Sequence, residues 1–130
     1  MTQSGRLGVR VYAARAQLPV EGATVAITQK TGNGKYKVIS LQETDRNGKI
    51  RPVHIPTPGR QESTRPNEGE VPFARCDIWV EEAGYELMVL EDVQVFPGVL
   101  SEQQVELEPL VRGEQWTQSA QVRPISPQDL

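Results

Sequence analysis

The chain has 130 residues, a formal net charge of −3 and one cysteine, and it contains 11 glycines and 10 prolines. Acidic and basic residues are mixed along it, which excludes the clustered positive face of a nucleic-acid-binding domain. No apolar stretch approaches the ~20 residues that span a bilayer, so we expect no membrane insertion, and a single cysteine excludes an internal disulfide.

The length is that of one domain, which can bury a hydrophobic core without disulfides. Residues 1–10 lack the apolar segment of a secretory signal peptide. We therefore expect either a cytosolic protein or one that reaches the cell wall or spore by another route.

The first half of the chain alternates apolar and polar residues in short runs, as strands with one buried face do. These runs are 7–11, 23–27 and 36–41. In the third run the phase of the alternation changes between Val38 and Ile39. Residues 18–22 contain Pro and Gly and predict a turn, and Asn33-Gly34 predicts a hairpin because both residues tolerate positive φ.

The second half begins with the clearest turn, residues 44–48, where we expect Asp45 to accept a hydrogen bond from the backbone two residues on. A short strand over 50–55 is interrupted by Pro52, and residues 56–72 contain four prolines and predict a long loop. The strongest strand pattern covers 73–82. Further short strands are predicted at 87–90, from 93 and at 104–108.

No segment shows sustained helical periodicity, so the sequence predicts an all-β fold. We expect an antiparallel Greek-key β-sandwich of about seven strands, of the transthyretin-like or immunoglobulin-like kind. The domain is predicted to cover residues 6–110, and residues 111–130 are predicted to be a polar tail or linker that contains Trp116.

Four motifs occur in order along the chain. They are LPVEGATV at 18–25, TDRNG at 44–48, DIWVEEAGY at 77–85 and VQVFPG at 93–98. Together they resemble the pattern of carboxypeptidase-regulatory-like and related transthyretin-like domains, over about residues 7–110. The resemblance implies a β-sandwich that acts as an accessory or interaction domain.

One segment departs from that pattern. The family enters its central strand through P-x-G-x-Y, whereas this chain has Val71-Pro72-Phe73-Ala74 after the proline-rich loop. This variant resembles the domain found beside peptidoglycan-binding and cortex-lytic modules of spore-forming Gram-positive bacteria. It implies a role near the cell wall or the spore cortex.

The sequence offers little for catalysis or metal binding. His54 is the only histidine, has no second ligand at a suitable spacing, and is predicted to be an ordinary strand residue. Cys76 shares the parity of Ile78 and Val80, so we expect a buried, inert thiol. Glu81-Glu82 and Glu91-Asp92 are expected to form a solvated edge rather than a calcium site. We expect no catalytic residue, no metal and no cofactor.

The candidate interaction surface is Trp79 together with Asp77 and Glu81, because parity places these three on the polar face of the strongest strand. Exposed aromatic residues anchor interfaces. Alternatively, the loop, the second sheet or the tail covers Trp79, and we favour docking of the tail, with Trp116 buried.

Two other functions of related folds fit the residues poorly. Transthyretin-like hydrolases of 5-hydroxyisourate use several histidines and a C-terminal Tyr-Arg-Gly-Ser, whereas this chain has one histidine and ends in Pro-Gln-Asp-Leu. Cna-B-type domains link a lysine of the first strand to an asparagine of the last, and 7–13 contains no lysine while 103–110 contains no asparagine. A non-covalent module remains, whose partner is a protein or a cell-wall glycan.

Overall fold

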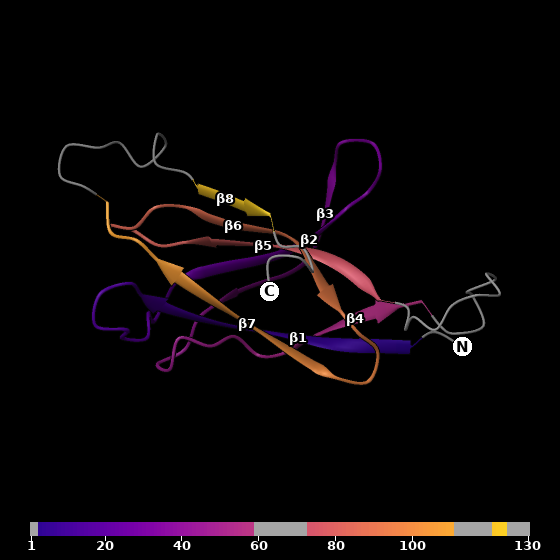
Figure 1. The fold of residues 1–130 in the computed structure, drawn as a ribbon, viewed down its shortest axis with the longest axis horizontal. Coiled ribbons are helices and arrows are strands. Elements are labelled where there is room, and N and C mark those ends of the chain that lie inside the picture. Colours follow the sequence, from indigo (N-terminus) through magenta and orange to yellow (C-terminus); the bar gives the residue numbers. More distant parts are fainter. Residues whose placement is uncertain (1–2, 59–72, 111–120, 125–130) are drawn as a thin grey trace.

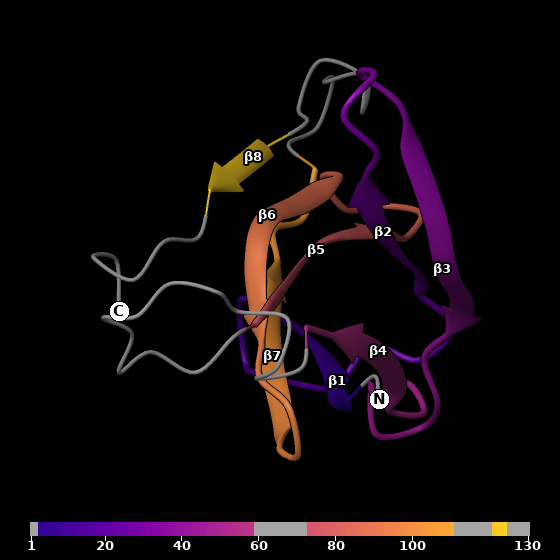
Figure 2. The same cartoon turned by 90° about the vertical axis from the view of Figure 1, so that its right-hand side faces the viewer.

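The computed structural model describes residues 3–58, 73–110 and 121–124, which form two β-sheets (Figure 1). The strands are β1 (Gln3–Ala13), β2 (Thr24–Lys30), β3 (Tyr36–Glu43), β4 (Val53–Thr57), β5 (Ala74–Glu81), β6 (Met88–Val95), β7 (Leu100–Leu107) and β8 (Gln121–Pro124). One sheet has the order β4-β1-β7 and the other the order β3-β2-β5-β6-β8. The view along the long axis shows the two sheets on either side of the core (Figure 2). The predicted all-β sandwich is confirmed.

The core between the sheets consists of aliphatic side chains from alternate strand positions, as the period of two predicted. Its fully buried members include Leu7, Val9, Val11, Val25, Ile27, Ile55, Ile78, Val80, Val105 and Leu107. Among the described residues, no helix has the length and apolar character needed to cross a bilayer.

Two strand pairs are parallel, although the sequence predicted an antiparallel fold. β1 pairs with β7 in parallel from Arg6–Leu100 to Ala13–Leu107, and β6 pairs with β8 in the same sense. The β1–β4, β2–β3, β2–β5 and β5–β6 pairs are antiparallel. β1 and β7 are far apart in the sequence, so no local signal specifies the direction in which they meet.

β6 is one continuous strand where the sequence predicted two. Its pairing with β5 shifts between Cys76–Val93 and Ile78–Leu90, so β6 carries an extra residue at this point. Asp92 lies there with a φ of 59°, a value that side-chain-bearing residues rarely adopt. This bulge lets Leu90 and Val93 both face the core, although they are three positions apart. The resulting change of parity is why the sequence predicted two strands here.

A second bulge lies between β2 and β3. Ile27 pairs with Ser40 and Thr28 with Val38, which leaves Ile39 as the extra residue. The bulge explains the change of phase within the third apolar run of the sequence.

The predicted loop at 56–72 begins later than expected. Pro56 and Thr57 belong to β4, whose pairing with β1 reaches Gln3–Thr57. β4 is an edge strand, and an edge position tolerates a proline that lacks an N–H. Residues 59–72 lie outside the described part of the chain.

The turn at 44–48 has the predicted geometry. The Asp45 Oδ1 atom accepts hydrogen bonds from the backbone N–H groups of Asn47 at 2.8 Å and Lys49 at 3.0 Å. The buried hydroxyl of Thr44 donates to the Val20 carbonyl at 2.6 Å and accepts from the Ala23 N–H at 2.9 Å. These bonds fix the turn against the segment that leads into β2.

Candidate interaction surface

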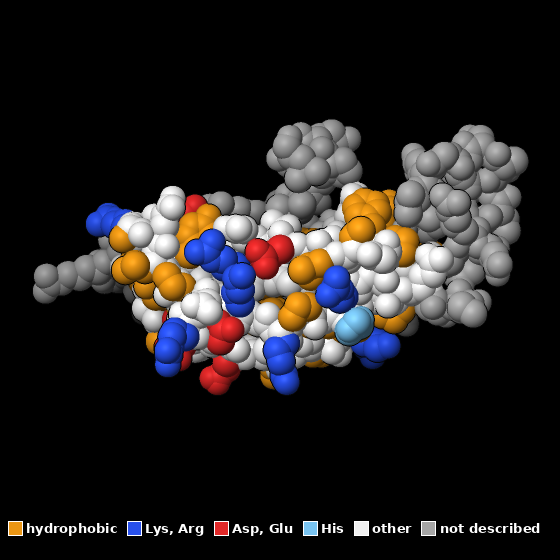
Figure 3. All heavy atoms as spheres, turned by 90° about the horizontal axis from the view of Figure 1, so that it is seen from below, with side chains coloured by type: hydrophobic (Ala, Val, Ile, Leu, Met, Phe, Trp, Pro, Cys, Tyr) orange, Lys and Arg blue, Asp and Glu red, His pale blue; other side chains and the backbone are white. Residues whose placement is uncertain are grey.

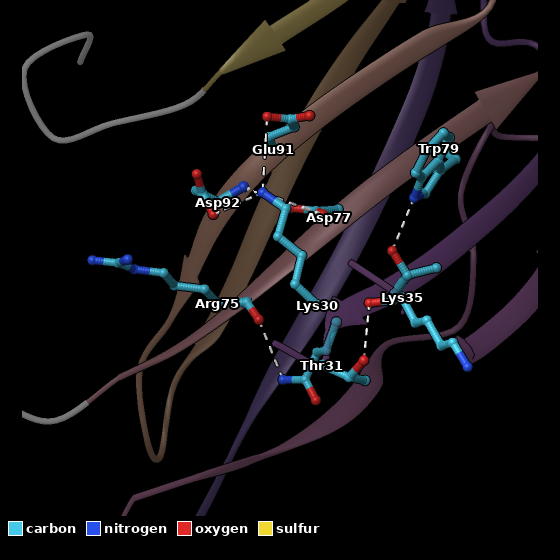
Figure 4. Close-up of polar contacts among 10 residues, drawn as sticks. Lys30, Thr31, Lys35, Arg75, Asp77, Trp79, Glu91 and Asp92 are labelled. Atoms are coloured by element: carbon cyan, nitrogen blue, oxygen red, sulfur yellow. Dashed lines mark hydrogen bonds and ion pairs between the residues drawn. The ribbon is translucent and has the colours of Figure 1, made fainter. Parts of the chain in front are cut away.

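Trp79 lies on the outer face of the five-stranded sheet, between the core residues Ile78 and Val80. Its indole Nε1 donates a hydrogen bond to Thr28 Oγ1 at 2.9 Å (Figure 4). The ring of Tyr36 meets it edge-on, with ring centroids 5.4 Å apart and an interplanar angle of 88°. Trp79 therefore points outward, as its parity predicted, and it is half-buried beside Tyr36 of β3.

The predicted docking of the tail concerns residues 111–130 and the burial of Trp116. Trp116 lies outside the described residues. Residues 121–124 form β8, whose backbone pairs with Met88–Glu91 of β6.

Three side chains of β3 extend the apolar surface from Trp79 to the edge of the sheet. The opposed pairs are Ala26–Leu41, Thr28–Val38 and Lys30–Tyr36. Because alternate residues of β2 share a face, Leu41, Val38 and Tyr36 all lie on the outer face. They are 67%, 61% and 44% exposed. We call Leu41, Val38, Tyr36 and Trp79 the apolar band. The β3 part of the band was not predicted from the sequence, because the bulge at Ile39 disguised the parity of Leu41.

β3 also has a free backbone edge. Within the described part of the chain it pairs with β2 alone, and Figure 2 shows it at the end of its sheet. The edge of a strand presents unpaired N–H and C=O groups that can pair with another chain.

An open groove of about 320 Å³ adjoins this edge. It is lined by Leu41, Gln42, Glu43, Asp45, Lys49 and Arg51. The Gln42 side chain joins its two walls, because its Nε2 donates to the Arg51 carbonyl at 3.1 Å and its Oε1 accepts from the Arg51 N–H at 3.0 Å. Figure 3 shows the molecule from below, the side on which Figure 1 has β1, β4 and β7; there Lys and Arg side chains lie between apolar ones.

Asp77 is not a surface residue, contrary to the sequence analysis. It is 2% exposed, and its Oδ1 accepts the backbone N–H of Asp92 at 2.9 Å. Its Oδ2 is buried without a hydrogen bond, and the Lys30 Nζ lies 3.8 Å away. Asp77 sits at the β5–β6 bulge, so its carboxylate fixes the backbone rather than binding a partner.

Lys30 stands among three carboxylates (Figure 4). Its Nζ lies 3.8 Å from Asp77, 3.8 Å from Glu91 and 3.4 Å from Asp92. Burial by itself would lower the pKa of Lys30, but the charges of Asp77, Asp92 and Glu91 outweigh it and raise the pKa. The amine is thus held as an ammonium ion, which is not a nucleophile.

Glu91 and Asp92, which were expected to be solvated, are partly exposed and also flank this ammonium ion. No group of three or more candidate metal ligands occurs in residues 3–58, 73–110 and 121–124. Glu81 is exposed at the end of β5, opposite Thr24. Of the three predicted surface residues, Trp79 lies in the apolar band, Glu81 lies beyond it, and Asp77 is buried.

Cys76 and His54 do not form a catalytic pair. Cys76 is on β5 of one sheet and 1% exposed, whereas His54 is on β4 of the other and faces solvent opposite Arg6. Burial raises the pKa of Cys76 to about 11; the Gln29 amide opposes this rise and the Asp77 charge adds to it. The predicted buried thiol is confirmed, and at neutral pH it is protonated.

We predict that Cys76 makes the fold less stable in alkali. The thiol ionises near pH ~8.5 in the unfolded chain and only at about 11 in the folded chain, so its contribution is complete below pH ~8.5 and is lost as pH rises toward 11. The expected loss between pH ~8 and ~10 is about 1–2 kcal/mol. Urea unfolding across that range measures it.

Cys76→Ala is the control for this prediction. It removes the thiol, so its stability should be lower by a cavity cost that does not change over the same pH range. Lys30 also has a raised pKa, and its stabilisation is lost only above the ordinary lysine value of ~10.4. An equal alkaline loss in Cys76→Ala would contradict the assignment.

The comparisons with known proteins find similar solved structures but no matching sequence. No protein-family model matches the chain, and no curated protein does. The structure of the Bacillus anthracis TIE protein aligns with 83% of this chain at 12% sequence identity and a TM-score of 0.49. GBS52, the minor pilin of Streptococcus agalactiae, aligns with 88% of this chain at 12% sequence identity and a TM-score of 0.48. The C-terminal domain of the shaft pilin SpaA from Lactobacillus rhamnosus GG aligns with 82% of this chain at 12% sequence identity and a TM-score of 0.43.

This chain spans 17% of the TIE protein, 48% of GBS52 and 98% of the SpaA domain. It therefore covers less than half of the first two chains. The likeness concerns the arrangement of strands alone.

Proposed function

We propose that this chain is a non-catalytic binding module that holds an extended segment of a partner polypeptide against β3. The observation that carries the proposal is the exposure of Leu41, Val38 and Tyr36 along a strand whose outer edge is unpaired in the described structure. An added strand would gain main-chain hydrogen bonds from that edge, and its alternate side chains would cover the apolar band.

The band suits a polypeptide better than a glycan. The indole N–H of Trp79 is already bonded to Thr28, and the Tyr36 ring lies against Trp79 edge-on. The most exposed members, Val38 and Leu41, are aliphatic and offer no hydrogen bond to a sugar hydroxyl. An extended peptide suits this surface, because its backbone pairs with the β3 edge while its apolar side chains cover Val38 and Leu41.

We further propose that the module is an accessory domain centred on residues 6–110, with a tail at 111–130 of which residues 121–124 pair with β6, working in a cell-wall or spore-cortex-associated system, in the cytoplasm or at the wall. The support is the order of the four motifs that resemble carboxypeptidase-regulatory-like domains. A role as an adhesin-like surface module that binds cell-wall glycan is the alternative that the test below separates.

The test uses the full chain and a display library of random peptides of about a dozen residues. Peptides selected on the wild type are measured against the double variant Val38→Thr/Leu41→Thr, in which threonine keeps the β propensity but removes apolar surface. Leu18→Thr is the matched control, because Leu18 is 63% exposed outside the band and Leu41 is 67% exposed within it. We expect at least roughly tenfold weaker binding to the double variant and unchanged binding to Leu18→Thr.

Circular dichroism and urea unfolding confirm that each variant is folded. Selected peptides that bind the double variant as tightly as the wild type would overturn the proposal. It would equally be overturned if no peptide were selected while isolated peptidoglycan bound the wild type and not the double variant, which is the result expected of a glycan-binding module.

A further inference from the structure

We infer that the strand bound at β3 is acidic, with carboxylate side chains alternating with apolar ones. The inference rests on the proposed function and names the chemistry of its partner. The charges around the β3 edge differ from those of the whole chain.

Four cations border the edge and its groove. Lys35 immediately precedes β3, Lys37 is its second residue, and both are exposed. Lys49 and Arg51 line the groove beside Leu41. None of the four forms an ion pair with another described residue. The chain as a whole has a net charge of −3, so this concentration of positive charge is local.

Two carboxylates lie nearby, and one of them is already engaged. The Asp45 side chain accepts the N–H groups of Asn47 and Lys49 within its own turn. Glu43 is the second, at the end of β3. The cations outnumber the carboxylates, and the potential along the edge favours a negative partner.

The position of Lys37 makes this preference selective. Lys37 pairs with Gln29, whose amide donates to the Arg75 carbonyl and reaches the Sγ of the buried Cys76, so both lie on the inner side of the sheet. An inward-pointing charge on an edge strand opposes pairing, because an added strand would cover the charge. A carboxylate opposite Lys37 removes that penalty. The same strand would place apolar side chains against Val38 and Leu41 on the outer face.

A second copy of the chain is a poorer occupant. Two β3 edges would each bring Lys35 and Lys37 to the joint, with the same excess of cations on both sides. Like charges across a strand pair destabilise it. The edge therefore selects against self-association and for a partner of opposite charge.

Three synthetic peptides of about the length of β3, which has 8 residues, test the inference with the full chain. They alternate Val with Glu, with Gln or with Lys. Titration followed by backbone amide shifts in NMR should show the Glu–Val peptide perturbing β3 and binding at least roughly tenfold more tightly than the Gln–Val peptide, with the difference shrinking at high salt.

Charge reversal supplies the specific variant. Lys37→Glu should abolish the preference for Glu–Val over Gln–Val. Arg15→Glu makes the same change of net charge in the turn after β1, in the other sheet, and should leave the preference unchanged.

Equal binding of Glu–Val and Gln–Val at β3, or tightest binding of Lys–Val, would overturn the acidic partner while leaving the binding module standing. A preference for Glu–Val that Lys37→Glu and Arg15→Glu reduce equally would also overturn it, because the effect would then come from net charge. The proposed function fails separately, when no library peptide depends on Val38 and Leu41.

Discussion

Gly48→Ala should be among the most damaging single substitutions, lowering the free energy of unfolding by about 3–5 kcal/mol. Gly48 has a φ of +75°, and a Cβ there would collide with the Val11 carbonyl oxygen and press on Pro19 at 3.2 Å. Neither the turn nor β1 can move easily, because the Gly48 carbonyl accepts the Val11 N–H at 2.7 Å and the Val20 N–H bonds the Val11 carbonyl at 3.0 Å. The loss is a large part of the stability of a typical domain and is measured by urea unfolding.

Gly84→Ala is the matched control. Gly84 has a φ of +86°, yet a Cβ there would meet nothing within 4 Å. This variant carries only the strain of the left-handed backbone, about 1 kcal/mol, and Gly84→Val, with its branched Cβ, about 1–3 kcal/mol. The difference between Gly48→Ala and Gly84→Ala isolates the steric contact with Val11. Equal losses in the two alanine variants would show that the turn relaxes around the added methyl group.

Asp77→Ala should lower the free energy of unfolding by about 2–3 kcal/mol, although the sequence places Asp77 on a polar face. The substitution removes the charge-assisted hydrogen bond from the Asp92 N–H to Asp77 Oδ1, which holds Asp92 at its φ of 59°. It also removes one of the carboxylates around Lys30. Urea unfolding of Asp77→Ala and Asp77→Asn measures the effect, and we expect the asparagine variant to lose less because it keeps an acceptor at the Oδ1 position.

Two further variants test this explanation. Glu81→Ala, at an exposed position of the same strand, should change stability by less than about 0.5 kcal/mol. Asp92→Gly should reduce the cost of Asp77→Ala, because glycine adopts positive φ without help from the Asp77 carboxylate. Additive effects of the two substitutions would contradict a role for Asp77 in holding the bulge.

Local patterns in the sequence predicted much of the sandwich. The runs at 7–11, 23–27 and 73–82 became β1, β2 and β5, because burying one face of a strand requires an apolar residue at every second position. The turn at 44–48 followed from Asp45, whose side chain bonds the backbone two residues on. The burial of Cys76 followed from its parity with Ile78 and Val80.

The candidate surface was predicted only at Trp79. The parity rule correctly placed Asp77 on the same face as Trp79, opposite Thr28, but the Asp92 backbone and Lys30 cover its carboxylate there. The parity rule also failed to predict Leu41 as part of the surface, because the bulge at Ile39 reverses the phase of β3 and puts Leu41 on the outer face with Val38. A rule with a period of two fails at each inserted residue.

The sequence by itself therefore determined the strand-forming segments, the best-defined turn and the identity of most core residues, since each depends on neighbours within a few positions. Only the tertiary structure decided that β1 and β7 run parallel, that β3 ends its sheet, and that Lys30 meets carboxylates from β5 and β6. These features join residues dozens of positions apart, such as Lys30 and Asp92, which are 62 positions apart in the chain. No local pattern specifies which distant strands pair, because pairing is settled by the burial of the whole core at once.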